Sequence, residues 1–186
     1  MAARLSPRAG APLAAVLLTT ALSVAACANP DRPAVQADEV PLPTPLRSFG
    51  SSVAVTLGAL EAALAGVGER LELPDRAFRP SEPEALLQTP RVVRRAGLAD
   101  LDDGYVVVYD APSVADAERL ADELADYLGS GFGQTNYVAD TQFAVGTFED
   151  TIVFTTWSQR RSDDPERAEA AFEAMASVGQ AVEVAK

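Results

Sequence analysis

The chain of 186 residues carries 27 acidic and 15 basic side chains, a formal net charge of −12, and it contains one cysteine and no histidine. This charge leaves too little lysine and arginine for phosphate binding, so we expect no nucleic-acid partner. Without histidine, imidazole catalysis and His-ligated zinc are excluded. A single cysteine forms neither an internal disulfide nor a thiolate metal cluster, so we expect no cofactor and no metal.

The first 27 residues have the pattern of a cleavable export signal. Arg4 and Arg8 form a short basic region, and residues 11–26 are an uncharged, mostly apolar run that ends at Cys27. This run is shorter than the roughly 20 residues of a transmembrane helix. We therefore expect residues 1–26 to be a signal peptide; an ordinary secretory signal cut after Ala26 would leave a free thiol.

The end of this run, Val24-Ala25-Ala26-Cys27, resembles the lipobox of bacterial lipoprotein precursors. In that family the cysteine receives a diacylglyceryl group, the signal is cut just before it, and the new N-terminus is acylated with a fatty acid such as palmitate. The resemblance implies lipidation at Cys27. It also implies a protein held in the cell membrane by this lipid anchor and facing outside the cytoplasm.

The composition of residues 27–48 predicts a tether. This segment contains Pro30, Pro33, Pro41, Pro43 and Pro45 with few apolar residues between them, which excludes a regular helix or a central strand. As polyproline II it could hold the domain up to roughly 60 Å from the anchor. Plain disorder is the alternative.

Phe49 to Leu71 is predicted to be a helix, because its apolar residues recur at spacings of four and three along one face. Glu61 is the only charge between Phe49 and Gly68, so a membrane span has to be considered. A carboxylate in mid-span and several glycines and serines favour a buried helix instead. Pro74 ends the predicted helix, and an irregular segment with one turn near Glu84 follows.

The rest of the chain predicts two strand-strand-helix units. Each helix has a capping residue at its start, Ser113 in the first unit and Asp163 or Asp164 in the second. We therefore expect one α+β domain over residues 49–186, a helix followed by two ββα units, with an antiparallel sheet of about four strands. Small bacterial lipoproteins have a broadly similar element order. The predicted strands are residues 91–98, 105–109, 142–148 and 151–157.

The acidic residues suggest two kinds of site. Asp100, Asp102 and Asp103 before Gly104 look like the start of a calcium loop, but the glycine comes one place early and position 12 is Ala111, so we expect a hairpin turn. Glycosidase chemistry needs two carboxylates facing each other across a cleft. Most of the acids lie on predicted helix exteriors, which favours plain solvated faces.

Aromatic residues are the remaining candidates for a binding surface. In the hairpin of residues 142–157, alternation places Phe143, Val145, Ile152 and Phe154 on one face and Trp157 with smaller residues on the other. We expect the helix of residues 49–71 to cover the second face; an open face would instead mark a partner surface. The candidate binding residues are Tyr105, Tyr109, Phe132, Tyr137 and Trp157.

These observations predict a lipid-anchored extracytoplasmic domain that is not an enzyme and acts by binding an envelope protein or a ligand. The alternative is a hydrolase that uses carboxylates alone and acts on cell-envelope polymers. An inward-pointing pair of acids would favour the hydrolase, whereas acids confined to helix exteriors would favour the binding domain.

Overall fold

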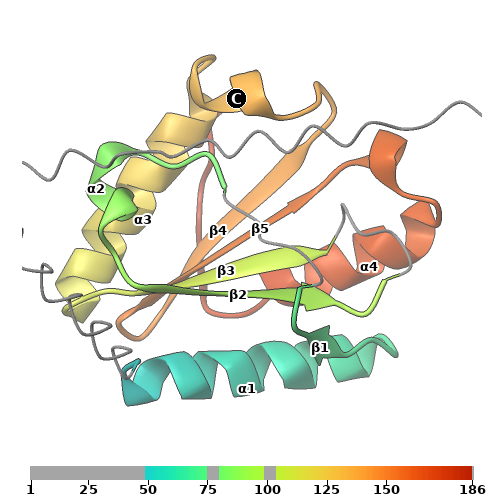
Figure 1. The fold of residues 1–186 in the computed structure, drawn as a ribbon, viewed down its shortest axis with the longest axis horizontal. Helices are drawn as coiled ribbons and strands as arrows, with labels where there is room; N and C mark the ends of the chain where they lie inside the picture. The colour runs from blue at the N-terminus through green and yellow to red at the C-terminus, as the bar shows by residue number, and fades with distance from the viewer. Residues whose placement is uncertain (1–48, 75–79, 99–103, 186) are drawn as a thin grey trace, which may run out of the picture. The chain divides into compact units, whose positions relative to one another are not determined.

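The computed structural model describes residues 49–74, 80–98 and 104–185, and these residues form a sheet with helices on both faces (Figure 1). The predicted signal peptide, Cys27 and the predicted tether lie outside the described residues, as do Asp100, Asp102 and Asp103. The helices are α1 (Ser51–Gly66), α2 (Glu84–Leu87), α3 (Val114–Gly129), α4 (Pro165–Ala176) and the 3-10 helices η1 (Gly133–Asn136) and η2 (Gln159–Arg161). The strands are β1 (Leu71–Glu72), β2 (Arg91–Ala96), β3 (Tyr105–Asp110), β4 (Gln142–Phe148), β5 (Thr151–Trp157) and β6 (Gln180–Val182).

The sheet confirms the predicted α+β class but has six strands where the sequence predicts about four. Its order is β1-β2-β3-β5-β4-β6, and every neighbouring pair is antiparallel. The two additional strands are short and lie at the edges. β1 starts at Leu71, which the sequence assigns to the end of the first helix.

The two ββα units are not separate blocks, because their strands interleave. β3 runs parallel to β4 with β5 between them, and β5 runs parallel to β6 with β4 between them. α3 makes the first of these crossings and α4 the second. Both crossings move in the same direction across the sheet but start from antiparallel strands, so two right-handed crossings must place their helices on opposite faces.

The packing agrees with that requirement. α1 and α4 lie on one face, over a core that includes Val106, Val108 and Val153. α2 and α3 lie on the other, over a core that includes Ile152 and Phe154 (Figure 1). The result is three layers with a sheet buried on both sides, which explains why β3 reads as an unbroken apolar run rather than an alternating one.

α1 begins and ends inside its predicted range. Leu60 and Leu64 are fully buried, whereas Val67, which the spacing of four and three residues places on the same face, is 43% exposed. Gly68 adopts a positive φ of 80° and lets the chain turn from the helix toward β1. The fully buried Thr56 fixes the helix on the sheet, since its Oγ1 donates to the Ser52 carbonyl and lies 2.8 Å from the Thr151 hydroxyl.

The two capped helices are confirmed. The Ser113 hydroxyl accepts from the Asp116 N–H at 3.1 Å, and the Asp164 carboxylate accepts from the Arg167 N–H at 3.3 Å with Pro165 as the first residue of α4. These contacts satisfy backbone donors that a helix N-terminus leaves free. The predicted turn between β4 and β5 is also present, with Glu149 in the left-handed region at φ 53°.

The sheet face that carries Trp157 is covered, as predicted, but α4 shares that role with α1. The Trp157 ring lies 6.3 Å from the Phe172 ring of α4, and Trp157 is 5% exposed. Val53, Leu60 and Leu64 of α1 belong to the same core cluster. Trp157 is therefore an interior residue in the described domain.

We expect Trp157 emission to be blue-shifted in the native protein and Phe172→Ala to shift it to the red, because the indole would lose its ring neighbour and admit water. The same substitution should destabilise the domain by up to about 3 kcal/mol, the lower end for a phenylalanine truncation since Phe172 is half-buried. Fluorescence during urea unfolding measures both effects. Val55→Ala on exposed α1 surface is the control and should change neither.

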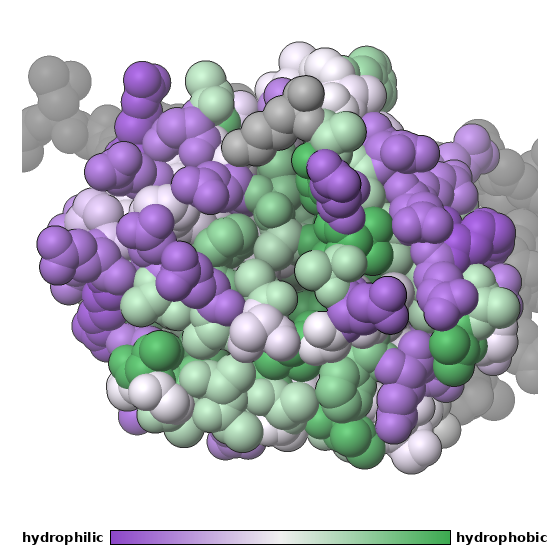
Figure 2. Space-filling view, turned by 180° about the vertical axis from the view of Figure 1, so that it is seen from behind, coloured by the Kyte–Doolittle hydropathy of each residue, from purple (hydrophilic) through white to green (hydrophobic). Residues whose placement is uncertain are grey.

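The outer side of α1 remains apolar and exposed. Val55 is 51% exposed, and the neighbouring positions on that side are mostly alanine and glycine. Figure 2 shows hydrophobic surface gathered along the lower part of the molecule, where α1 lies in Figure 1, with hydrophilic side chains on both flanks. Within the described ranges, no helix has the length and hydropathy needed to cross a membrane.

Candidate ligand pocket

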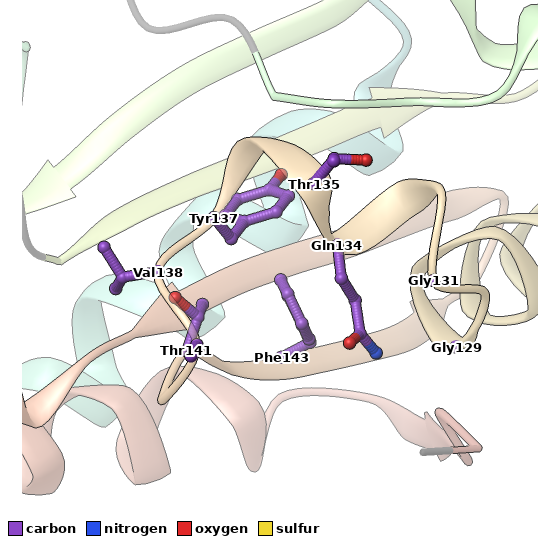
Figure 3. A pocket seen from close by; sticks show the side chains of 9 residues that line it. Gly129, Gly131, Gln134, Thr135, Tyr137, Val138, Thr141 and Phe143 are labelled. Atoms are coloured by element: carbon purple, nitrogen blue, oxygen red, sulfur yellow. The ribbon is translucent and has the colours of Figure 1, made fainter.

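A pocket of about 550 Å³ lies where α3 ends and the chain turns through η1 toward β4. Figure 3 shows Gln134 and Tyr137 extending from the η1 segment beside Phe143 of β4, while Thr135 points away from Phe143. None of the lining residues is charged. They are Gly129, Gly131, Gln134, Thr135, Tyr137, Val138, Ala139, Thr141 and Phe143.

Close packing of the backbone shapes this pocket. A side chain at Gly133 would lie 2.0 Å from the Tyr127 carbonyl oxygen, so only glycine lets η1 approach α3 this closely. The Gln134 side-chain amide donates to the Leu128 carbonyl at 3.0 Å and fixes η1 on the end of the helix. These two contacts hold η1 against the end of α3 and so fix this wall of the pocket.

One aromatic pair lines the pocket, and a second pair lies beside it. The Tyr137 and Phe143 rings meet edge to face, with centroids 4.8 Å apart and an interplanar angle of 82°. The Tyr127 and Phe132 rings are also edge to face, at 6.2 Å. Phe132 is 77% exposed, so it extends from the loop into solvent beside the pocket.

The tyrosine hydroxyls tie the pocket to a segment that lies far away in sequence. The Tyr137 hydroxyl accepts from the Ser81 N–H at 3.1 Å, and the Ser81 hydroxyl lies 2.9 Å from the Tyr127 hydroxyl. The Asn136 side chain also donates to Ser81, at 3.3 Å. These bonds fix the Tyr137 ring, which is the aromatic wall of the pocket, through its polar end.

The next residue, Glu82, is the centre of a buried charged cluster. Its side chain is 1% exposed, and it accepts from Arg91 of β2 at 2.5 Å and from the Tyr109 hydroxyl of β3 at 2.8 Å. Arg91 and Tyr109 are directly paired in the sheet, so both side chains reach the same carboxylate. The cluster locks residues 81 and 82 onto the sheet and so supports Tyr137 indirectly.

Burial controls the ionisation of both tyrosines. Desolvation raises the pKa of Tyr137 to about 12, although the Ser81 N–H bond opposes the shift. Desolvation also raises the pKa of Tyr109 above its usual value, and the negative charge of Glu82 and the hydrogen bond to it add to the effect. Both phenols are therefore neutral at physiological pH, and Tyr137 adds no charge to the pocket.

We expect stability to fall as pH rises from 10 to 12. The unfolded tyrosines lose protons near pH 10, whereas folded Tyr137 keeps its proton until about pH 12. Below pH 10 both states keep this proton, and the domain has its full stability. As pH rises from 10 to 12, unfolded Tyr137 loses its proton while folded Tyr137 retains it, so the free energy of unfolding falls by about 1.4 kcal/mol per pH unit. Urea midpoints from pH 8 to 12 measure it, and Tyr137→Phe should reduce the slope. Titration of Tyr137 near pH 10 in the folded protein would contradict this expectation.

The five predicted binding residues do not form one surface. Tyr137 lines the pocket, and Phe132 lies beside it. Tyr109 is fully buried and reaches the same region only through Glu82. Tyr105 is 4% exposed, and Trp157 lies on the opposite face of the sheet.

Among the described residues, Glu118, Asp122 and Glu183 line a cavity of about 380 Å³, but all three are exposed at the surface, which does not match the buried acid of a carboxylate hydrolase. Among the described residues two carboxylates are buried, and each is neutralised by its own arginine: Glu82 by Arg91, and Glu69 by Arg167, which binds it with two nitrogens. The described residues also contain no group of three metal-ligating side chains. The predicted helix-exterior acids are at the surface, namely Asp116, Glu118, Asp122, Glu123, Asp126, Glu166, Glu169 and Glu173.

Sequence reasoning missed Ser81, Glu82 and Gln134. Ser81 and Glu82 lie between Pro80 and Pro83, in a stretch without periodicity, so no pattern marks them as buried. The signal that could have found Glu82 is Arg91, because an arginine at the start of an otherwise apolar strand needs a partner. Gln134 has no comparable signal.

Comparison of the chain with protein-family models, with curated proteins and with solved structures finds no match.

Proposed function

We propose that this protein is a lipid-anchored, extracytoplasmic binding domain without catalytic activity, and that the pocket under η1 takes a neutral ligand. The observation that carries the proposal is the lining of this pocket. It holds aromatic rings, amide and hydroxyl groups but no charged side chain. A volume of about 550 Å³ lies within the usual range for small-molecule sites.

The missing charge defines the class of ligand. A charged ligand entering this pocket would lose hydration without gaining a counter-charge, which is costly in a partly buried site. Anions are further opposed by the net negative charge of the chain. A neutral molecule with polar groups and an apolar face, such as a sugar, matches the combination of Gln134, Thr141, Tyr137 and Phe143.

The anchor is supported by the order of residues around Cys27, and the absence of catalysis by the pairing of both buried carboxylates with arginine. An anchored domain of this kind would meet its ligand outside the cytoplasm. Binding there requires no reactive side chain, in agreement with a chain that lacks histidine.

The proposal is tested by titrating the protein with cellobiose and with its uronic-acid counterpart while following backbone NMR shifts. We expect cellobiose to shift the residues of η1 and the start of β4, and the anionic sugar to bind at least about tenfold more weakly. Equal binding of both sugars, or shifts confined to another surface, would contradict it.

A matched pair of variants places the site. Gly131 lines the pocket and has no atom within 4 Å of the position that its Cβ would take, so Gly131→Leu adds a bulky side chain at the pocket with no clash at the Cβ. Gly58 on α1 is equally open but lies elsewhere, which makes Gly58→Leu the control. We expect Gly131→Leu to weaken cellobiose binding at least about tenfold and Gly58→Leu to leave it unchanged.

A further inference from the structure

The cavity of about 380 Å³ that Glu118, Asp122 and Glu183 line lies between one flank of α3 and β6, the last strand of the sheet. We call this cavity the α3–β6 groove. It shares no lining residue with the pocket under η1, so the two sites are separate. Its other lining residues are Thr147 of β4 and Gln180, Ala181 and Val182 of β6.

β6 is an edge strand. It pairs with β4 on one side, and among the described residues no strand pairs with its other side. Backbone hydrogen-bonding groups point alternately to the two sides of a strand, so one set on β6 faces β4 and the other set faces outward. An outward-facing set of N–H and carbonyl groups is a template for another extended segment.

The hydrogen bonds of the sheet identify the outward set. The Ala111 N–H donates to the Asp150 carbonyl, and the alternation can be followed from this bond through β5 and β4 to β6. Gln180 and Val182 use their backbone groups on β4. The N–H and carbonyl groups of Ala181, which lies between them, therefore point away from the sheet.

The α3–β6 groove is acidic and lacks counter-ions. Arg119 is the one basic residue of α3, and it pairs with Asp116 and Glu123, which do not line the groove. The three carboxylates of the groove form no salt bridge with any residue that the structure describes. Their negative charge is therefore available to a basic partner.

The open edge and the carboxylates lie where one extended partner can use both. Val182 packs into the core under α3, so the side chain of Gln180, two residues earlier, lies on the same face of β6. A strand added beside β6 would carry every second side chain on this face as well. Those side chains would lie next to Glu118 and Asp122, which are four residues apart and so share one face of α3.

We infer that the α3–β6 groove is a docking site for an extended, basic segment of another protein, which adds to the sheet as an antiparallel strand beside β6. The backbone groups of Ala181 and Glu183 pair with the added strand. Arginine or lysine side chains at alternate positions of that strand pair with Glu118 and Asp122. Every neighbouring pair in this sheet is antiparallel, so the added strand continues the existing pattern.

A basic peptide fits the groove better than other occupants. A second copy of this chain carries a net charge of −12 and would be repelled by the groove. A metal ion would use the carboxylates but not the strand edge, and the described residues hold no group of three metal-ligating side chains. An added strand gains affinity from main-chain hydrogen bonds and specificity from its alternate side chains.

A synthetic peptide of about eight residues that alternates arginine and threonine, blocked at both ends, is the probe for the full chain. In the inferred register its arginines face α3 and its threonine N–H groups donate to β6. We expect it to shift the backbone NMR signals of residues 180–183 and of the first half of α3. Amide exchange at Ala181 should slow at least about tenfold when the peptide is bound.

The matched peptide alternates arginine and proline. It keeps the charge and the spacing of the probe but lacks the N–H groups that must donate to the edge of β6. We expect it to bind at least about tenfold more weakly. Equal binding of the two peptides would overturn the inference, because it would show attraction by charge without strand pairing.

A pair of double variants tests the charges. Glu118→Gln/Asp122→Asn should weaken binding of the arginine–threonine peptide at least about fivefold, because two exposed ion pairs are lost. Glu169→Gln/Glu173→Gln is the matched control, since it removes two exposed carboxylates at the same spacing on α4. We expect the control to change the affinity by less than about twofold. Equal losses in both would overturn the inference, because only net charge would then matter.

Ala181→Pro tests the strand edge directly. It removes an N–H group that makes no bond to β4, and we expect it to weaken peptide binding at least about tenfold. Ala181→Val keeps this N–H and should leave the affinity within about twofold. Blue-shifted Trp157 emission verifies that both variants are folded.

Two further results would overturn the inference. The first is a set of peptide-induced shifts confined to another surface, including the pocket under η1. The second is displacement of the peptide by calcium chloride at an ionic strength where sodium chloride has no effect, because it would identify a cation site. Neither result depends on lipidation or on cellobiose binding, so the inference can fail while the proposed function holds.

Discussion

Arg91→Met is expected to destabilise the domain by about 3–5 kcal/mol, because it leaves the carboxylate of Glu82 buried without its counter-charge. The Glu82 side chain is 1% exposed and the Arg91 side chain 22%, so water cannot replace the lost partner fully. The Tyr109 hydroxyl would remain as a donor to Glu82, but a neutral hydroxyl does not compensate a buried negative charge. Urea unfolding at neutral pH measures the loss.

The control for Arg91→Met is Arg119→Met. Arg119 also pairs with two carboxylates, Asp116 and Glu123, but its side chain is 60% exposed. Exposed pairs contribute about 0–1 kcal/mol, so this variant should lose little stability. The double variant Glu82→Gln/Arg91→Met removes the charge together with its partner and should recover most of the loss. Equal effects of Arg91→Met and Arg119→Met would show that Glu82 reaches water.

The same cluster connects stability with the pocket. Glu82 follows Ser81, and Ser81 holds the hydroxyl of Tyr137. Loss of the Arg91 contact should therefore loosen the aromatic wall even when the domain remains folded. The wall of the pocket therefore depends on Ser81, which lies 56 residues before Tyr137 in the sequence. Through Glu82, which contacts Arg91 and Tyr109, the same segment links the β2–β3 pair to the pocket beside β4.

Local signals predicted the parts of this fold that local chemistry determines. Ser113 and Asp164 cap helices because their side chains satisfy free N–H groups of the same segment, and Pro165 fits the first turn. β4 and β5 pair across two residues, so their register is fixed by a short turn. Each of these features depends on residues within a few positions of one another.

Features set by distant partners were not predicted. β6 has three residues and β1 has two, so neither shows a pattern, and both are strands only because an edge of β4 or β2 lies beside them. α3 and α4 lie on opposite faces of the sheet because β6 pairs with the far edge of β4. The connection from β5 through α4 to β6 therefore crosses over β4. Leu71 matches the helical period of α1, but pairing with Ala96 places it in β1.

The candidate site was predicted only in part, for a similar reason. Tyr137 and Phe132 were found because aromatic residues in a loop are conspicuous. Tyr105, Tyr109 and Trp157 lie on strands, and a sheet covered on both faces buries strand aromatics whichever side they face. The sequence could not show the second covering layer, because that layer depends on the interleaved strand order.

Cys27→Ser is expected to abolish the proposed membrane anchoring completely, since no other residue of the chain can form the thioether that would join the lipid. The precursor should remain uncut, or the protein should appear in the soluble fraction. Metabolic labelling with a fatty-acid probe, followed by separation of membrane and soluble fractions, measures both effects. The free energy of unfolding of the domain should not change, because Cys27 precedes Phe49, where the described residues begin, by 22 positions.

The adjacent substitution Ala28→Ser is the matched control for Cys27→Ser. It adds the same hydroxyl one position later and leaves the thiol in place, so labelling and membrane retention should match those of the native chain. Incorporation of the probe into Cys27→Ser would contradict the proposal that the protein is a lipoprotein. Loss of the anchor should leave the expected binding of cellobiose in the pocket under η1 unchanged, because the lining of that pocket, residues 129–143, and the Ser81 contact that supports it belong to the domain.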